Sequence, residues 1–395
     1  MALLKLSTST GALALVLGCS NDPGFVVQNA APPSSLDGAA DGATRADAGA
    51  VDAPDDASAK DPYEPLPPLG DGVATLAGSS LRGQIDDRRE RARFSNPVNI
   101  AVGPDGMIYV ADYGNGVIRV VSPAGLAATL VHQPGFAHPY GLVFTADGTL
   151  YAQTDANDMG EHTFETGTFW RIDRRFGTAT VVLRNAGRPR GLAALPDGRI
   201  FYADPEHQLV GILDPVRVRV VDLAGERNVA AFADGEGNRA RFNHPYDAAY
   251  LDGVVIVVDQ LNHRLRAVTL DGRVSTFAGT GAIGRADGDR LRATFNRPQA
   301  LARDAAGNLF VSDMDNFMVR RIARDGAVTT FAGVGREGYR DGLPAAAEFA
   351  GLEGLDVSPD GAFLYVADGN RGLGGASHRV RRVSLARVPV MPTLP

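Results

Sequence analysis

A unit of the same kind recurs six times after Val73, and this repeat constrains the fold more than any other feature of the chain. Each unit opens with a short apolar segment, followed by a turn that is usually Asp-Gly. A second apolar segment then ends in aspartate, and a third combines apolar residues with arginine. The opening residues, 42 to 56 positions apart, are Pro97, Pro139, Pro189, Pro245, Pro298 and Leu352. Asp-Gly supplies the positive φ that a tight hairpin needs, so each unit predicts successive antiparallel strands.

A fourth segment completes the unit, as in residues 274–279 (VSTFAG) and 328–333 (VTTFAG). The block after Leu352 has three such segments but lacks the fourth. A matching segment, residues 73–78 (VATLAG), stands before the first unit. We therefore expect this N-terminal strand to pair with the C-terminal unit and close a ring.

Six units of four antiparallel strands predict an all-β fold, a six-bladed β-propeller over residues 73–395. One small sheet cannot cover both of its faces, so neighbouring sheets would stack around a common axis. A helical solenoid is disfavoured because no long segment keeps a 3.6-residue apolar period. A sandwich or barrel could use such strands, but neither requires six equivalent units.

The first 18 residues predict a secretory signal, since Lys5 precedes the apolar run GALALVLG, which is too short to span a bilayer as a helix. The string Val16-Leu17-Gly18-Cys19 resembles the bacterial lipobox. That resemblance implies removal of residues 1–18 and lipidation of Cys19, and Ser20 would favour the outer membrane of the cell envelope. An ordinary signal peptide with a chance cysteine is the alternative.

Residues 19–72 would comprise the lipid anchor site and a disordered tether rich in Asp, Ala, Pro and Gly. Between Ser20 and Gly72 there are ten acidic residues and two basic ones, with few large apolar side chains, so burial cannot offset the ordering entropy. The chain from Val73 on has as many basic as acidic residues. A neutral domain gives no electrostatic reason to expect nucleic acid as a partner.

Residues 275–326, STFAGTGAIGRADGDRLRATFNRPQALARDAAGNLFVSDMDNFMVRRIARDG, resemble an NHL repeat. The hallmarks are FAG-x-G, a downstream DG, A-x-F-x-x-P, G-x-L-x-V-x-D and V-R-R-I. Units starting at Asn96, His244 and Arg297 match well, whereas those starting at His138 and Arg188 are degenerate. The resemblance covers the whole repeated region. It implies a six-bladed propeller but leaves function open, because NHL propellers include both binding platforms and enzymes.

In propellers of this type the innermost strand begins at the top mouth of the channel, so the residues after each opening position should ring that mouth. Packing alone does not call for the polar and aromatic side chains found there, which favour a ligand or partner surface. A water-filled mouth with tolerated polar residues is the alternative. The candidates are Val98, Asn99, Tyr140, Arg190, Tyr246, Asp247, Gln299 and Glu353.

We expect the protein to have no cofactor, and a bound metal ion is the alternative. Similarity to lactonase-like six-bladed propellers would imply calcium at Asn99, Asp247 and Glu353. Similarity to amidating-lyase-like propellers would imply zinc at His138 and His244. Three further histidines are expected on the same face, namely His162, His207 and His263.

An aspartate ends the second segment of every unit, and a feature repeated in this way indicates a structural task, such as hydrogen bonds that fix the following turn. These aspartates are Asp112, Asp155, Asp204, Asp259, Asp313 and Asp368. Two loops depart from the repeat by their length, residues 155–171 and 368–381, and both are expected to rise on the top face.

The sequence therefore favours a lipid-anchored, extracytoplasmic and monomeric propeller that binds a protein, peptide or glycan at its top face. A metal-dependent hydrolase or lyase, using a metal-bound water or a carboxylate, is the second hypothesis. RNA binding is disfavoured by compartment and by charge.

Overall fold

The computed structural model describes residues 2–3, 13–17, 26–29, 68–369 and 377–385. The chain divides into two compact units, Met1–Pro68 and Leu69–Pro395. In the first unit, β1 (Ala2–Leu3), β2 (Leu13–Leu17) and β3 (Val26–Asn29) form a three-stranded antiparallel sheet. β3 lies within the predicted tether, where its two valines favour a strand. Cys19 and the rest of that tether up to residue 67 lie outside the described residues.

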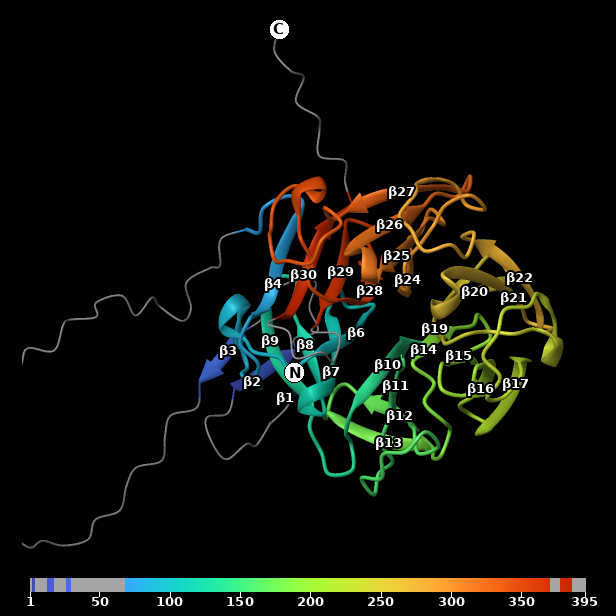
Figure 1. Ribbon diagram of the computed structural model, residues 1–395. Helices are drawn as coiled ribbons and strands as arrows, with labels where there is room; N and C mark the ends of the chain where they lie inside the picture. The colour runs from blue at the N-terminus through green and yellow to red at the C-terminus, as the bar shows by residue number, and fades with distance from the viewer. Residues whose placement is uncertain (1, 4–12, 18–25, 30–67, 370–376, 386–395) are drawn as a thin grey trace, which may run out of the picture. The chain divides into compact units, whose positions relative to one another are not determined.

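The second unit consists of six antiparallel sheets arranged as the blades of a propeller (Figure 1), which confirms the predicted fold. The innermost strand of each blade is given first below. Blade 1 contains β6 (Pro97–Val102), β7 (Ile108–Asp112), β8 (Val117–Val121), β9 (Leu126–Val131) and β5 (Asp87–Arg88). Blade 2 contains β10 (Pro139–Phe144), β11 (Leu150–Thr154), β12 (Thr168–Asp173) and β13 (Thr178–Leu183). Blade 3 contains β14 (Gly191–Ala194), β15 (Ile200–Asp204), β16 (Leu209–Asp214) and β17 (Arg219–Gly225).

The remaining three blades follow the same order. Blade 4 contains β19 (Pro245–Leu251), β20 (Val254–Asp259), β21 (Arg264–Thr269), β22 (Arg273–Ala278) and β18 (Gly235–Glu236). Blade 5 contains β24 (Pro298–Arg303), β25 (Leu309–Asp313), β26 (Met318–Ile322), β27 (Ala327–Ala332) and β23 (Gly288–Asp289). Blade 6 contains β28 (Leu352–Val357), β29 (Phe363–Asp368), β30 (His378–Ser384) and β4 (Val73–Ser79).

Short 3-10 helices lie in the connections. They are η1 (Arg89–Arg91), η2 (Tyr113–Asn115), η3 (Gly237–Arg239), η4 (Gln260–Asn262), η5 (Met314–Asn316) and η6 (Pro344–Ala346). No helix in the described part of the chain has the length and apolar character needed to cross a bilayer.

Blade 6 is closed by β4, as the sequence predicts. β4 runs antiparallel to β30, with Val73 opposite Val383 and Ala77 opposite Val380. The Gly72 amide also donates to the Ser384 hydroxyl at 3.3 Å, across 312 residues of chain. Hydrogen bonds between distant parts of the sequence therefore hold the last blade together.

Three blades have one more strand than the four predicted. β5, β18 and β23 have two residues each and pair with the outermost strands of blades 1, 4 and 5. Each belongs to the connection between blades, which runs back along the outer edge and covers its backbone groups. Blades 2 and 3 have four strands each.

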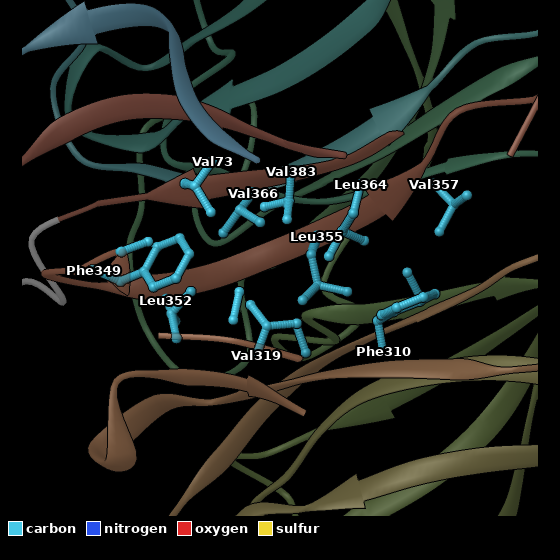
Figure 2. Close-up of a cluster of buried hydrophobic side chains, with 14 residues drawn as sticks. Val73, Phe310, Val319, Phe349, Leu352, Leu355, Val357, Leu364, Val366 and Val383 are labelled. Atoms are coloured by element: carbon cyan, nitrogen blue, oxygen red, sulfur yellow. The ribbon is translucent and has the colours of Figure 1, made fainter. Parts of the chain in front are cut away.

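Apolar side chains between adjacent blades form the core. Figure 2 shows the cluster between blades 5 and 6, where Phe310 and Val319 of blade 5 lie near Leu355 and Val366 of blade 6. Val73 of the closing strand joins the same cluster. The phenylalanine of the A-x-F motif anchors four blades and is fully buried in each, as Phe94, Phe242, Phe295 and Phe349. Removing one such ring typically costs about 3–5 kcal/mol.

A buried arginine in the third strand braces four blades. In blade 5, Arg320 lies 2.9 Å from Asp313 and 2.6 Å from Asp287, and its side chain is fully buried. The Asp313 carboxylate also accepts the Asn316 side-chain amide at 2.8 Å, which confirms its turn-fixing task. The four equivalent clusters are Arg119–Asp112–Asp86, Arg266–Asp259–Asp234, Arg320–Asp313–Asp287 and Arg381–Asp368–Asp341.

Candidate functional site

The innermost strands surround a central channel with a cavity at each end. We call the first the upper cavity; its volume is about 320 Å³. Its lining residues are Asn96, Val98, Tyr113, Tyr140, Arg190, His244, Tyr246, Gln260, Arg297, Gln299, Met314 and Glu353. The lower cavity, of about 340 Å³, is lined largely by Ala, Val and Leu of the same strands, together with Asn99, Asp247 and Asp356.

The residue directly after each opening position lines the upper cavity in all six blades. These residues are Val98, Tyr140, Arg190, Tyr246, Gln299 and Glu353. Asn99 and Asp247, which we expected beside them, instead line the lower cavity and the constriction above it. The next residue of a strand lies one step further along the channel, so the predicted ring is in fact two rings at different depths.

Inner strands of neighbouring blades pack closely side by side at the constriction. A Cβ atom on Gly191 would lie 2.4 Å from the Cα of Asp247, and one on Gly354 would lie 2.6 Å from the Cα of Asn99. Only about 10 Å³ remains at this level. The upper cavity is therefore a pocket with a floor and not an open passage.

Arg190 is at the centre of the polar network in the upper cavity. Its guanidinium donates to the Tyr246 hydroxyl and to the Asp155 carboxylate, both at 3.0 Å, and it lies 4.6 Å from the centre of the Tyr140 ring. The Asp155 side chain is fully buried, while that of Arg190 is 17% exposed. The pair therefore holds a positive group at the cavity wall with its charge compensated.

A second set of polar groups surrounds Glu353. Gln299 donates its side-chain amide to Glu353, and the Tyr140 hydroxyl donates to the same carboxylate at 3.4 Å. All three side chains are more than nine-tenths buried. Burial raises the pKa of Tyr140 well above its usual range, with the neighbouring Tyr246 and Glu353 acting in the same direction, so this phenol stays neutral.

His244 is neutral and its tautomer follows from its partners. Gln260 donates its amide to Gln299 at 3.1 Å, so its oxygen is the atom that faces His244 Nδ1 at 3.0 Å. Nδ1 must then carry the proton, which leaves Nε2 as an acceptor. Burial lowers the pKa of His244 to about 4, and Arg190 and Arg297 add to this effect.

Asp155 does not have the turn-fixing role that its place in the repeat predicts. Thr154 stands opposite Pro139, as Asp112 stands opposite Pro97, so Thr154 occupies the structural position. Trp170 takes the place of the buried arginine and donates Nε1 to the Thr154 hydroxyl at 2.8 Å. Asp155 therefore lies one residue further on, where it can reach Arg190.

Blade 3 also lacks the buried arginine, because Gly211 stands opposite Tyr202 where an arginine would be. Asp204 instead contacts His207, with 2.7 Å between Oδ2 and Nδ1. His207 Nε2 lies 2.9 Å from Glu165 of the long loop after blade 2's second strand. The bond to Asp204 raises the pKa of His207. Asp204 therefore also has a structural role, but it positions His207 and the loop of Glu165 and does not pair with an arginine.

The residues proposed as metal ligands do not converge. Glu353 lines the upper cavity, whereas Asp247 faces the lower one and accepts the Leu301 backbone amide at 2.8 Å. His244 lines the upper cavity, but His138 does not, and its ring stacks on His162 with 4.6 Å between centroids. Among the described residues, no three His, Cys, Asp or Glu side chains are arranged to hold a metal. Neither the calcium set nor the zinc set fits this geometry.

The upper cavity also has lining residues that the sequence did not single out, including Tyr113, Gln260 and Met314. All three directly follow the aspartate that ends the second strand of their blade. The position after that aspartate is therefore a second set of site positions in the repeat. The sequence contains this signal, because the three residues occupy the same place in their units.

No family model matches the chain. It is 31% identical over 285 residues to Protein SUPPRESSOR OF QUENCHING 1, chloroplastic, of Arabidopsis thaliana, covering 63% of this chain and 27% of that protein. It is 27% identical over 313 residues to NHL repeat-containing protein 2 of Gallus gallus, covering 64% and 42%. The chain thus spans less than half the length of these curated relatives.

Several solved structures of similar fold come from bacteria. A structural genomics protein of unknown function from Bacteroides thetaiotaomicron has a TM-score of 0.65 at 20% identity, over 79% of this chain and 75% of that one. An auxiliary nutrient binding protein from the same organism has a TM-score of 0.60 at 16% identity, over 79% and 76%. A gluconolactonase from Xanthomonas campestris has a TM-score of 0.53 at 15% identity, over 80% and 90%. These likenesses show the fold alone, and the curated relatives support NHL repeats within this six-bladed β-propeller.

Proposed function

We propose that the protein is a binding scaffold that receives a protein, peptide or glycan group in its upper cavity. The observation that carries this proposal is the convergence of buried polar side chains from blades 2 to 6 on one pocket. They are Tyr140, Arg190, Tyr246, Gln299 and Glu353. Burying polar groups is unfavourable unless they are hydrogen-bonded, so packing alone does not account for them.

The polar groups of the lower cavity have a different use. Asp247 of blade 4 accepts the Leu301 amide of blade 5, and Asp356 of blade 6 accepts the Val102 amide of blade 1 at 2.7 Å. Each carboxylate thus joins two neighbouring blades. In the upper cavity the side chains bond to one another, which leaves lone pairs and donors for a ligand.

A metal-dependent hydrolase or lyase is the second candidate function. One observation favours an enzyme, since the neutral His244 has a free acceptor beside Tyr246 and near Arg190, a combination suited to proton transfer. The lack of a converging ligand set among the described residues argues against the metal. Elemental analysis of the purified protein tests this: stoichiometric Ca or Zn that is lost in Asp247→Ala or His244→Ala would favour the enzyme.

We also propose that the propeller is lipid-anchored in the bacterial cell envelope, in the outer membrane, as a monomer. The support is the lipobox-like string ending at Cys19. Two acyl chains anchor a protein stably, because each buried CH₂ contributes about 0.8 kcal/mol. Cys19→Ser should move the protein from the membrane fraction to the soluble fraction. Unchanged membrane association would refute the anchor.

A ligand screen tests the binding proposal directly. The Cys19→Ser protein is screened by thermal shift against peptides and oligosaccharides, and each hit is repeated with Arg190→Met. We expect the shift to vanish in Arg190→Met and to persist in Arg199→Met, a surface control whose side chain is 39% exposed. A ligand that shifts Arg190→Met as much as the parent protein binds elsewhere, and a screen with only such ligands contradicts the proposal.

A further inference from the structure

We infer that the upper cavity takes one neutral pyranose ring, the terminal sugar of a glycan, and takes it end-on. This inference rests on the proposed binding function and specifies its ligand. It follows from three properties of the pocket: the division of its wall, the compensation of its charges and its closed floor.

Aromatic rings form one part of the wall. Tyr113, Tyr140, Tyr246 and His244 come from blades 1, 2 and 4 and follow one another with ring centroids 6.0, 5.8 and 5.4 Å apart. The rings of Tyr113 and His244 offer apolar faces to the C–H groups of a sugar, whereas Arg190 covers a face of Tyr140, and the hydroxyl and imidazole edges remain polar. A ligand that matches this wall must itself be apolar on its faces and polar at its edges.

Amide and carboxylate groups form the other part. Gln260, Gln299 and Glu353 come from blades 4, 5 and 6 and are linked by hydrogen bonds in that order. Together with the Nε2 atom of His244, they provide acceptors for several hydroxyl donors from one small ligand. A ring that carries hydroxyls around its edge satisfies this arrangement better than a peptide side chain with one or two polar atoms.

The charges at the pocket are already compensated. Arg190 is paired with Asp155, and Arg297 lies 3.7 Å from Asp315. An anionic ligand would have to compete with these two carboxylates for the arginines. A cationic ligand would find the face of Tyr140 already occupied by the Arg190 guanidinium at 4.6 Å. Both charged classes are therefore disfavoured relative to a neutral one.

The size of the pocket and its narrow lower end determine which part of a sugar chain can enter. Its volume of about 320 Å³ is at the small end of the usual range of ligand pockets, about 300–1,000 Å³. Below it, only about 10 Å³ of open space remains at the constriction. A sugar chain cannot pass through the channel, so only its end can enter.

The experiment is calorimetric titration of the Cys19→Ser protein with the methyl glycosides of glucose, galactose, mannose and N-acetylglucosamine. We expect at least one to bind. Its amino-sugar and uronate analogues should bind about tenfold more weakly or worse, as should a linear oligosaccharide that carries the same sugar only at internal positions. Glu353→Gln should weaken binding of the neutral sugar by about tenfold, the effect of a hydrogen bond to a charged group.

Asp356→Asn is the matched control, because it changes a carboxylate of the lower cavity, beyond the constriction. It should leave sugar affinity unchanged, and thermal melting verifies that both variants are folded. Tyr113→Leu is a second test, which should weaken binding through the aromatic wall without touching a charge.

The outcomes separate the inference from the proposal on which it rests. If only charged sugars or peptides bind, and Arg190→Met abolishes that binding, the cavity is a binding site but the neutral sugar is wrong. If neutral sugars bind and Glu353→Gln and Tyr113→Leu have no effect, the site lies elsewhere and the inference is again wrong. If no ligand of any class depends on the upper cavity, both the inference and the proposed function fail.

Discussion

Blades 1, 4, 5 and 6 each contain a cluster of one buried arginine and two carboxylates, which blades 2 and 3 lack. In the first group, a fully buried arginine holds two carboxylates, one from its own blade and one from the connection before it. In the second group that arginine is replaced by Trp170 and Gly211. In the regular blades, the aspartate that ends the second strand pairs with this arginine, whereas Asp155 of blade 2 reaches Arg190 at the channel and Asp204 of blade 3 fixes a loop.

This difference teaches where a repeat protein can acquire a site. A buried ion cluster is stable only when every partner is present, so it cannot be altered one residue at a time. Blade 2 has a neutral Trp170–Thr154 hydrogen bond in its place. Asp155 is then available to position Arg190 at the upper cavity. One asymmetric part of the site, the Arg190–Asp155 pair, thus comes from the two blades that match the repeat least.

The largest expected effect comes from replacing the buried arginine of blade 5 by tryptophan, the residue that blade 2 has at this position. Arg320→Trp should lower the free energy of unfolding by about 3–5 kcal/mol, because it leaves Asp313 buried without its cation. Adding Asp313→Thr should recover a large part of this loss by recreating the Trp–Thr hydrogen bond. Denaturant unfolding measures both. Arg324→Trp is the control, since that side chain is 72% exposed. A double variant as unstable as the single one would show that the two solutions are not interchangeable.

Asp155→Ala should have a smaller effect than Asp112→Ala, although both remove a fully buried carboxylate. Arg190 is 17% exposed whereas Arg119 is fully buried, so we expect a loss of about 2 kcal/mol against about 3–5 kcal/mol, even though Arg119 keeps Asp86 as a partner. Denaturant unfolding compares the two variants. Equal losses would mean that Asp155 is as structural as its counterpart in blade 1.

Trp170→Phe keeps the ring but removes the hydrogen bond to Thr154. Because both groups are neutral and buried, the expected loss is about 1 kcal/mol. This is the value that makes the comparison with Arg320 informative, since the two side chains occupy the same position in their blades. The double change, Trp170→Phe with Thr154→Val, should cost more than the single one, because it also removes the hydrogen bond from the Thr154 hydroxyl to the Ala156 carbonyl, and an equal cost would contradict this account.

His207→Gln should have the smallest effect, and one that depends on pH. The pKa of His207 is raised above its value in the unfolded chain by the bond to Asp204, so its contribution to stability is fully present below about pH 6.5 and is lost as the pH rises through the folded pKa. The difference in unfolding free energy between the parent protein and the variant should therefore be larger at about pH 6 than at about pH 9. A difference that is constant or grows with pH would refute a protonated His207 between Asp204 and Glu165.

The fold was predictable because the repeat is encoded in turns and opening residues that recur along the whole chain. The upper ring was predictable for the same reason, since Tyr140, Arg190 and Glu353 follow equivalent opening positions. The depth of Asn99 and Asp247 follows from strand geometry, because the next residue of a strand lies one step further along the channel. The register shifts between Pro97 and Asn99 and between Pro245 and Ala248 were not predictable, since no residue type signals them.

The role of Asp155 was hidden by an ambiguous interval. Seven residues separate it from the turn glycine Gly148, one more than in blade 1, but the same seven separate Asp368 from Gly361. Only the strand register shows that the extra residue lies after the structural position in blade 2 and in the turn in blade 6. The contact of Glu165 with His207 could not be predicted either, because it joins two loops 42 residues apart.

The closure of blade 6 has a consequence for how the protein is made. β4 leaves the ribosome before any blade is complete, while its partner β30 emerges some 300 residues later. At about 5–20 residues per second, that interval lasts roughly 15–60 s. Throughout it, the backbone of β4 lacks its strand partner, although Leu76 can already pack against Phe94 and Ile100 of blade 1. The pairing of β4 with β30 can therefore form only after synthesis has reached the last blade, so a chain that stops earlier cannot close the ring.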